Sequence, residues 1–407
     1  MNKILTSVEI TKDNAASDYL RFKYNDNSYQ EYLITNDAPK SCTTHMGDLG
    51  DICIGALDKG ERKICKDDCV YYLIENGQQI RDRRNKKISN RRDNFEYCIF
   101  LINTNFHGET FSDATFYGAI FNKVGNFGGV KFNNGVSFNS AKFIKYASFA
   151  AAKFNDEVSF NHARFNKNVA FSGAEFNGEV NSVETIFNGS VDFDTITTTI
   201  DTTGSSGNKT TTTPPSFSKK VDFTRAIFNH VLNFSGVESI NLDLEHAIID
   251  RIEYGNTKFS ADKRETFLTL KNVALKQHDQ IKALEFHTQE YQSHYEKLNW
   301  NNADKWILGF ENSVSYFATN AGRAIGWLVF LIVFSYFFIF MLLGGGDANM
   351  HDFVRFTAPI SYDLTTIFRN KITVGFFVGL LFILYKILQF VMIYEVVKSF
   401  RKFSRTL

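Results

Sequence analysis

Residues 154–175 read FNDEVSFNHARFNKNVAFSGAE, two consecutive copies of an eleven-residue unit. Each copy has Phe at its first and seventh positions, and a small or β-branched residue stands two positions before the Phe that follows. Around this stretch the Phe spacing alternates between five and six residues over 121–176. The rhythm resumes over 187–193 and 217–234, with Ser182 in one of the Phe slots. A regular internal repeat therefore decides the fold.

The residue types in the repeat favour a β-solenoid over a helical supercoil. An eleven-residue period can mark a right-handed helical supercoil, but Phe, Val, Asn and Ser are poor helix formers. In a solenoid, each five- or six-residue unit makes one short side, and the Phe and its partner two residues earlier both point inward. Asn and Gly tolerate the backbone angles of the corners. The sequence thus predicts a ladder of stacked Phe in the core, with a structural role.

The repeat, over roughly residues 105–250, resembles the pentapeptide-repeat proteins. The resemblance implies a right-handed, square β-helix with four units per coil. At ~4.8 Å per coil, it implies about five coils and a rod of about 25 Å. Segment 195–216 (TITTTIDTTGSSGNKTTTTPPS) interrupts the count. Its composition predicts a mobile loop at one corner, which is either a tolerated insertion or a partner-binding excursion.

Two apolar segments near the C-terminus predict a transmembrane hairpin. Residues 324–343 (AIGWLVFLIVFSYFFIFMLL) carry no charge over 20 residues, which matches the thickness of a bilayer core. Residues 372–397 form a second apolar run that contains Lys386, Gln389 and Glu395. A basic tail follows: Lys398, Arg401, Lys402 and Arg405. The positive-inside rule predicts that this tail is cytoplasmic, and two spans place the N-terminal part there as well.

Lys386 is costly within an apolar span, and such residues usually face protein or water. One interpretation is a pore or helix contact lined by Lys386 and by Gln389, which lies on the same helix face. The other is that Lys386 snorkels toward the headgroups beside Glu395 and Lys398. The loop segment 353–368 would be a re-entrant or an interfacial half-helix. Two spans with a dipping segment are the plan of two-helix cation channels, but no TVGYG filter is present, so the channel hypothesis is an analogy.

The first hundred residues lack the repeat. Segments 8–10, 19–24 and 29–34 predict strands. Five residues with metal-ligand chemistry lie within 28 positions: Cys42, His45, Cys53, Cys65 and Cys69. They predict either a structural zinc site or reduced thiols, and no other cofactor is expected. A run of basic residues over 81–92 is either a solvated loop or strand edge, or a contact for anionic lipid or nucleic acid.

Four parts follow along the chain: an N-terminal Cys-containing domain (1–100), the solenoid (101–255), connecting and capping helices (256–322) and the transmembrane hairpin with its basic tail (323–407). The predicted fold class is mainly β, a right-handed β-helix preceded by a small α+β or β domain. This arrangement resembles bacterial membrane-anchored pentapeptide-repeat proteins. The resemblance implies a multi-pass protein of the bacterial cytoplasmic membrane, with both termini in the cytoplasm.

The formal net charge of +1 argues against a dedicated nucleic-acid-binding protein. No catalytic motif stands out, so we expect a protein that is not an enzyme. The first functional hypothesis is a membrane-anchored scaffold that presents a cytoplasmic binding surface to a protein partner. The alternative is a homo-oligomeric, ion-channel-like pore gated by the solenoid and the N-terminal domain. A third hypothesis, an inhibitor of a DNA enzyme, agrees poorly with the mild charge of the repeat.

Overall fold

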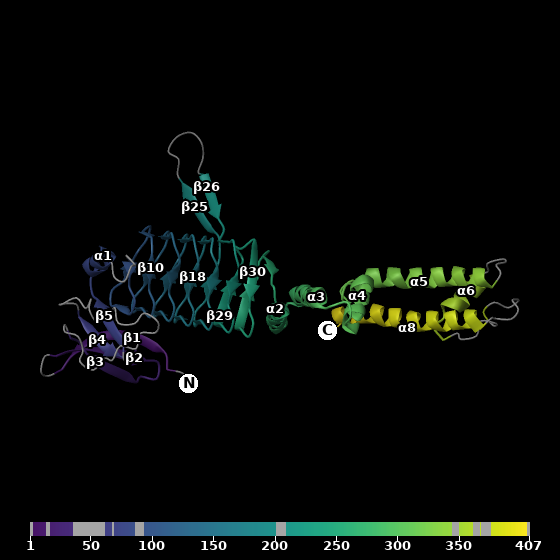
Figure 1. Ribbon diagram of the computed structural model, residues 1–407, viewed down its shortest axis with the longest axis horizontal. Helices are drawn as coiled ribbons and strands as arrows, with labels where there is room; N and C mark the ends of the chain where they lie inside the picture. The colour runs from purple at the N-terminus through teal and green to yellow at the C-terminus, as the bar shows by residue number, and fades with distance from the viewer. Residues whose placement is uncertain are drawn as a thin grey trace. The chain divides into compact units, whose positions relative to one another are not determined.

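The computed structural model describes residues 3–13, 17–35, 62–66, 69–85, 93–200, 209–343, 350–360, 367 and 376–404. The chain divides into two compact units, Met1–Gln280 and Ile281–Leu407. The first unit holds a parallel β-solenoid and a small N-terminal sheet, and the second is helical (Figure 1). The predicted fold class is confirmed as a mainly β protein, with a parallel β-solenoid and a small N-terminal β domain.

Short parallel strands build the solenoid, and equivalent strands of successive coils pair in register. Val136, Val158 and Val180 are such partners, 22 residues apart in sequence, which is the length of four alternating five- and six-residue units. In the described residues one side of the solenoid is an eight-stranded sheet. Its strands are β6 (Asp93–Asn94), β10 (Ala114–Thr115), β14 (Val136–Ser137), β18 (Val158–Ser159), β22 (Val180–Asn181), β28 (Val221–Asp222), β30 (Ser239–Asp243) and β32 (Lys258–Ser260).

A second side of the solenoid is a smaller parallel sheet, five-stranded within the described residues. Its strands are β9 (Thr110–Phe111), β13 (Lys131–Phe132), β17 (Lys153–Phe154), β21 (Glu175–Phe176) and β27 (Ser216–Phe217).

The remaining two sides belong to one continuous sheet, because β29 (Ile227–Asn233) pairs with both ladders. One ladder contains β4 (Lys63–Lys66), β5 (Cys69–Ile74), β7 (Cys98–Phe100), β11 (Ile120–Phe121), β15 (Lys142–Phe143), β19 (Arg164–Phe165) and β23 (Ile186–Phe187). The other contains β8 (Thr104–Asn105), β12 (Gly125–Asn126), β16 (Ala147–Ser148), β20 (Val169–Ala170) and β24 (Val191–Asp192), and β31 (Ile248–Glu253) also pairs with β29.

The predicted Phe ladder fills the core of the solenoid. Phe121 and Phe143 stack with ring centroids 4.5 Å apart, and Phe116 and Phe138 do so at 4.8 Å. Rings from neighbouring sides meet edge to face, as Phe127 and Phe138 do at 5.4 Å. Because aromatic pairs favour both geometries, each ring stabilises its own column and the adjacent one.

The stack is longer than the five coils that the sequence predicts, with about eight turns in the part described. At its beginning, Phe95 and Phe100 already occupy core positions below Phe116 and Phe121. At its end, Ile249 takes the position of a Phe, since it pairs with Phe228. A count based on Phe alone therefore stops before the last coils.

Half of the corners are left-handed turns two residues after a core position. Gly108, Gly118, Gly129 and Gly173 have positive φ angles, as glycine readily does. The equivalent residues in other coils carry side chains: Ser140, Ala151, His162, Glu184, Arg225 and His246. The corner conformation is thus imposed by the stack, and glycine is not required in every coil.

The insertion is a β-hairpin at its base. β25 (Ile196–Ile200) pairs antiparallel with β26 (Lys209–Thr213), and the hairpin projects from the solenoid (Figure 1). The segment predicted as a mobile loop at one corner therefore contains two paired strands, whose Thr and Ile residues favour β structure.

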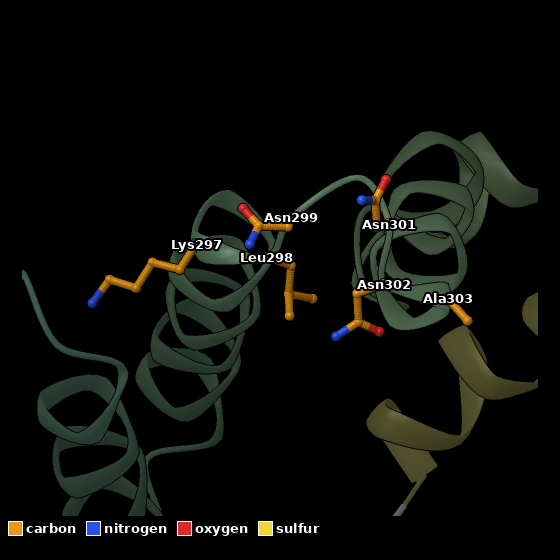
Figure 2. Close-up of a pocket in the computed structure, with 6 residues that line it drawn as sticks. All are labelled: Lys297, Leu298, Asn299, Asn301, Asn302 and Ala303. Atoms are coloured by element: carbon orange, nitrogen blue, oxygen red, sulfur yellow. The ribbon is translucent and has the colours of Figure 1, made fainter.

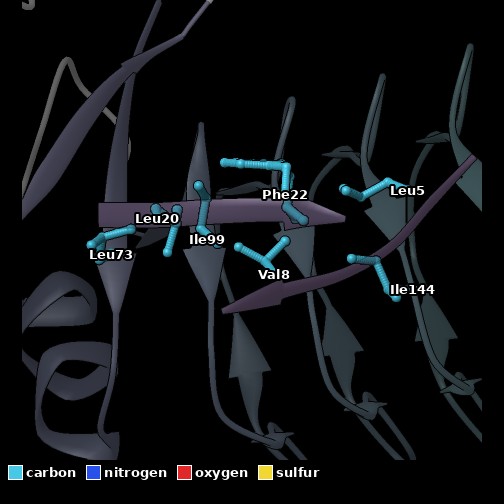
Figure 3. Packing of buried hydrophobic residues seen from close by; sticks show 8 residues of the cluster. Leu5, Val8, Leu20, Phe22, Leu73, Ile99 and Ile144 are labelled. Atoms are coloured by element: carbon cyan, nitrogen blue, oxygen red, sulfur yellow. The ribbon is translucent and has the colours of Figure 1, made fainter. Parts of the chain in front are cut away.

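The predicted N-terminal strands are present as the antiparallel sheet of β1 (Leu5–Lys12), β2 (Asp18–Tyr24) and β3 (Tyr29–Leu33). Val8 and Phe22 from this sheet share a buried cluster with Ile99 and Ile120 on the outside of the first coils (Figure 3). Asn122 completes the contact, since its side chain accepts a hydrogen bond from Val8 N at 2.7 Å and donates one to Val8 O at 2.8 Å.

Helix α2 (Arg264–Lys276) covers the other end of the solenoid. Leu244 N donates a hydrogen bond to Thr266 Oγ1, and Phe267 and Leu270 are buried. Asp243, also buried, forms ion pairs with Lys220 and Lys263, and each Nζ lies 2.9 Å from Asp243 Oδ2. This end is thereby capped, as an open repeat stack requires.

The helical unit contains most of α3 (Gln280–Lys297), then α4 (Ala303–Ser315), α5 (Ala321–Leu342), α6 (Met350–Thr357) and α8 (Phe376–Ser404). By length and composition, α5 and α8 are able to cross a membrane: their most apolar windows have mean hydropathies of 2.5 and 2.3. Few residues of these windows are buried, 11% and 28%, so most of this apolar surface is exposed. A buried core helix would show the opposite.

Candidate functional site

The most unusual polar cluster lies between α5, α6 and α8. Helix α6 packs at the end of the hairpin where α5 ends and α8 begins (Figure 1). Its Phe356 is fully buried against Tyr336 of α5, and it stacks on Tyr385 of α8 at 4.5 Å. Of the segment predicted as a half-helix, 353–368, residues 353–357 are helical as part of α6 (Met350–Thr357), while 361–366 and 368 lie outside the described residues. Its re-entrant or interfacial position stays a prediction.

Lys386 bonds to the C-terminal end of α6. Its ammonium donates to Phe356 O at 2.9 Å and to Ala358 O at 2.7 Å, and the side chain is 3% exposed. The last carbonyls of a helix have no partner inside the helix and carry the negative end of its dipole. A lysine at this position donates the hydrogen bonds that these carbonyls lack, and the carbonyls in turn stabilise its positive charge.

Gln389 extends the same contact. Its amide donates to Thr357 O at 2.8 Å, and its oxygen accepts from Lys386 Nζ at 3.3 Å. The rings of Phe382 and Tyr385 lie 5.3 and 5.2 Å from the ammonium, within the range of cation–π attraction. The predicted pair is therefore brought together in a helix–helix contact within one chain.

Glu395 belongs to a separate cluster near the opposite end of the hairpin. Its carboxylate accepts from Ser315 Oγ at 2.8 Å and lies 3.7 Å from Lys398 Nζ. Lys398 also pairs with Glu311 of α4. Sequence reasoning missed Ser315 and Glu311, because they are 80 and 87 positions from their partners and lie on a helix of unexceptional composition.

The predicted zinc ligands receive no structural test. Cys42, His45 and Cys53 lie outside the described residues. Cys65 and Cys69 lie on the paired strands β4 and β5, and the structure does not describe the side chains of these two cysteines. Across the described ranges, no group of three or more His, Cys, Asp or Glu side chains is suited to a metal ion.

Part of the predicted basic segment forms helix α1 (Gly77–Asn85), so a loop or strand edge is not its structure there. Arg81 is exposed and donates to the side chain of Gln78. Arg83 and Arg84 belong to the same helix, and 86–92 lie outside the described residues.

An open hollow lies where α3 leads into α4. Lys297, Leu298, Asn299, Asn301, Asn302 and Ala303 line it (Figure 2). Asn302 is already used, since its side chain caps α4 by accepting from Asp304 N at 2.9 Å. The hollow is therefore the junction between two helices and contains no convergent set of reactive groups.

Together these observations define a class of protein: a parallel β-solenoid with a stacked aromatic core, followed by two apolar C-terminal helices that hold a short helix between them. No protein-family model, curated protein or solved structure matches the chain.

Proposed function

We propose that this chain is a membrane-anchored, non-enzymatic scaffold of the pentapeptide-repeat type, with a right-handed solenoid. In this proposal α5 and α8 cross the cytoplasmic membrane of a bacterium, and both termini and the solenoid lie in the cytoplasm. The exposed apolar surface of the two helices supports the membrane location. The basic C-terminal tail supports the orientation.

The observation that carries the scaffold hypothesis is the internal pairing of Lys386 and Gln389. Both side chains are buried and hydrogen-bonded to α6 of their own chain. An intramembrane lysine normally requires protein or water as a partner, and here one chain supplies it. The hairpin can then act as a self-sufficient anchor, while the solenoid offers an extended, regular surface to a protein partner.

A pore is the second candidate, because α6 does pack between the two apolar helices, as the plan of a two-helix channel requires. In that case several chains would surround a water-filled path, since two spans cannot enclose one. Lys386 and α6 would then lie beside the path and would change conformation on opening.

The subunit count distinguishes the two candidates. The full chain is reconstituted in lipid nanodiscs, and its mass is measured by mass photometry. A monomer or dimer supports the scaffold. A stable ring of roughly four or more chains, together with ion flux in vesicles that Lys386→Leu abolishes, would replace the scaffold by the pore.

A further inference from the structure

Helix α4 exposes large apolar side chains on one face. Trp306 and Ile307 are 65% and 58% exposed, and Trp300, just before the helix, is 63% exposed. The two indoles form a unit: their rings meet edge to face at 5.5 Å, and Trp306 Nε1 donates to Trp300 O at 3.1 Å. At 3.6 residues per turn, Ala303 lies between Trp306 and Ile307 on this face, and the exposed Asp304 lies at its edge.

Two charged groups of α4, Lys305 and Glu311, are held by partners elsewhere in the helical unit. Glu311 pairs with Lys398, and Lys305 donates to Leu298 O at 2.7 Å and lies over the ring of Trp300. Ser315 donates to Glu395 of α8. These contacts fix the rotation of α4 against α8, so the exposure of the tryptophans is a property of the fold and does not arise from a loose helix.

The location of α4 suggests its partner. It packs on the hairpin through a cluster that includes Val314, Ala324 and Met392, at the end where α5 begins and α8 finishes (Figure 1). The uncharged run of α5 starts at Ala324, and Arg323 precedes it, exposed. Helix α4 thus lies at one boundary of the apolar hairpin.

We propose that α4 is an interfacial helix whose Trp300–Trp306–Ile307 face inserts into the boundary between lipid headgroups and acyl chains. Tryptophan is enriched at that depth of a bilayer, and amphipathic helices lie there with their apolar face buried. The inference rests on the proposed membrane anchor and adds a lipid contact outside the two spans. It would hold the start of the helical unit against the membrane surface.

The three tryptophans of the chain make the test direct. Trp327→Phe leaves only Trp300 and Trp306 as fluorophores, and the double change Trp300→Phe with Trp306→Phe leaves only Trp327 in α5. Each full-length variant is reconstituted into phosphatidylcholine vesicles whose acyl chains carry bromine either near the glycerol end or near the methyl end. Aqueous iodide is the quencher for exposed indoles.

For Trp327→Phe we expect strong loss of emission with the shallow bromine, weaker loss with the deep bromine and little loss with iodide. The double variant, with Trp327 within the span, should also lose emission to brominated lipid. If Trp327 is quenched by brominated lipid while the pair is quenched only by iodide, the interfacial helix is refuted and the anchor stands. If neither quencher reaches the pair, protein covers this face and the inference is again refuted. If brominated lipid quenches none of the tryptophans, the anchor falls too.

Discussion

Single phenylalanines set the stability of the solenoid. Phe138 is fully buried and stacks between Phe116 and Phe160, with centroids 4.8 and 5.1 Å away. We expect Phe138→Ala to destabilise the chain by about 3–5 kcal/mol, because it removes a large buried ring and leaves a cavity in a rigid stack. Thermal unfolding of the full chain in detergent, followed by far-ultraviolet circular dichroism, measures the loss. Tyr146→Ala, at a half-exposed position, is the control and should shift the midpoint little.

Lys386 should stabilise α6 but should not be required for the hairpin to insert into the membrane. In Lys386→Leu, the carbonyls of the buried Phe356 and of Ala358 lose their donor, at a cost of about 1–3 kcal/mol. We expect faster hydrogen exchange in 350–357, with the chain still in the membrane fraction. Phe390→Leu, on the exposed face of the same helix, should leave exchange in α6 unchanged. Equal exchange in both variants would contradict the role assigned to this lysine.

Asp243 should make the stability of the capped end depend on pH. Burial favours its neutral form, but hydrogen bonds from Lys220 and Lys263 outweigh this and lower the pKa of the carboxyl below its usual value. Such a group stabilises the fold above its unfolded pKa of about 3.9 and loses that contribution as the pH falls further.

Asp243→Asn should therefore cost about 2 kcal/mol at neutral pH and flatten the loss of stability on acidification. Melting temperatures of both proteins at neutral pH and near pH 3 provide the comparison. Parallel losses in wild type and variant would show that the contacts of Asp243 do not drive the acid sensitivity.

At the scale of elements, the hairpin of β25 and β26 is expected to be dispensable for the stack. Phe176 stacks on Phe217 at 4.8 Å across the insertion, so the core column continues without it. Replacing residues 198–211 by a short Asn-Gly turn should keep the melting temperature within a few degrees, since the change retains Ile196 and Thr213, which lie against Gly173 at the base of the hairpin. A large drop would instead give the hairpin a structural role.

Repetition explains which elements could be predicted. One Phe carries little information, but a spacing kept over many coils leaves a single arrangement in which every ring is buried. The docking of the N-terminal sheet gave no such signal, since Asn follows Phe in several coils and nothing in the sequence marks Asn122 as the partner of Val8, 114 positions away. Likewise, the contact of Lys386 with Phe356 O of α6 joins residues 30 positions apart, and no repeat in the sequence indicates it. The polarity of Lys386 marked it as notable, and only its three-dimensional partner determined the role.

In the whole molecule, the two units differ in structure and in the surface that they expose. The first unit is a regular, capped stack with a small sheet on its side, and the second presents apolar surface along two helices. Lys386 and Glu395 of the hairpin are each paired within the chain. An anchor needs no more than this, whereas a pore additionally needs neighbouring chains.

The central claim is that α5 and α8 hold the chain in a membrane. Alkaline carbonate extraction of membranes from cells that produce the full chain tests it most directly. A peripheral membrane protein serves as the control for extraction, and a known multi-pass protein serves as the control for retention. If α5 and α8 anchor the chain, it stays in the pellet with the multi-pass control. Its release into the soluble fraction with the peripheral control would contradict the anchor and every proposal built on it.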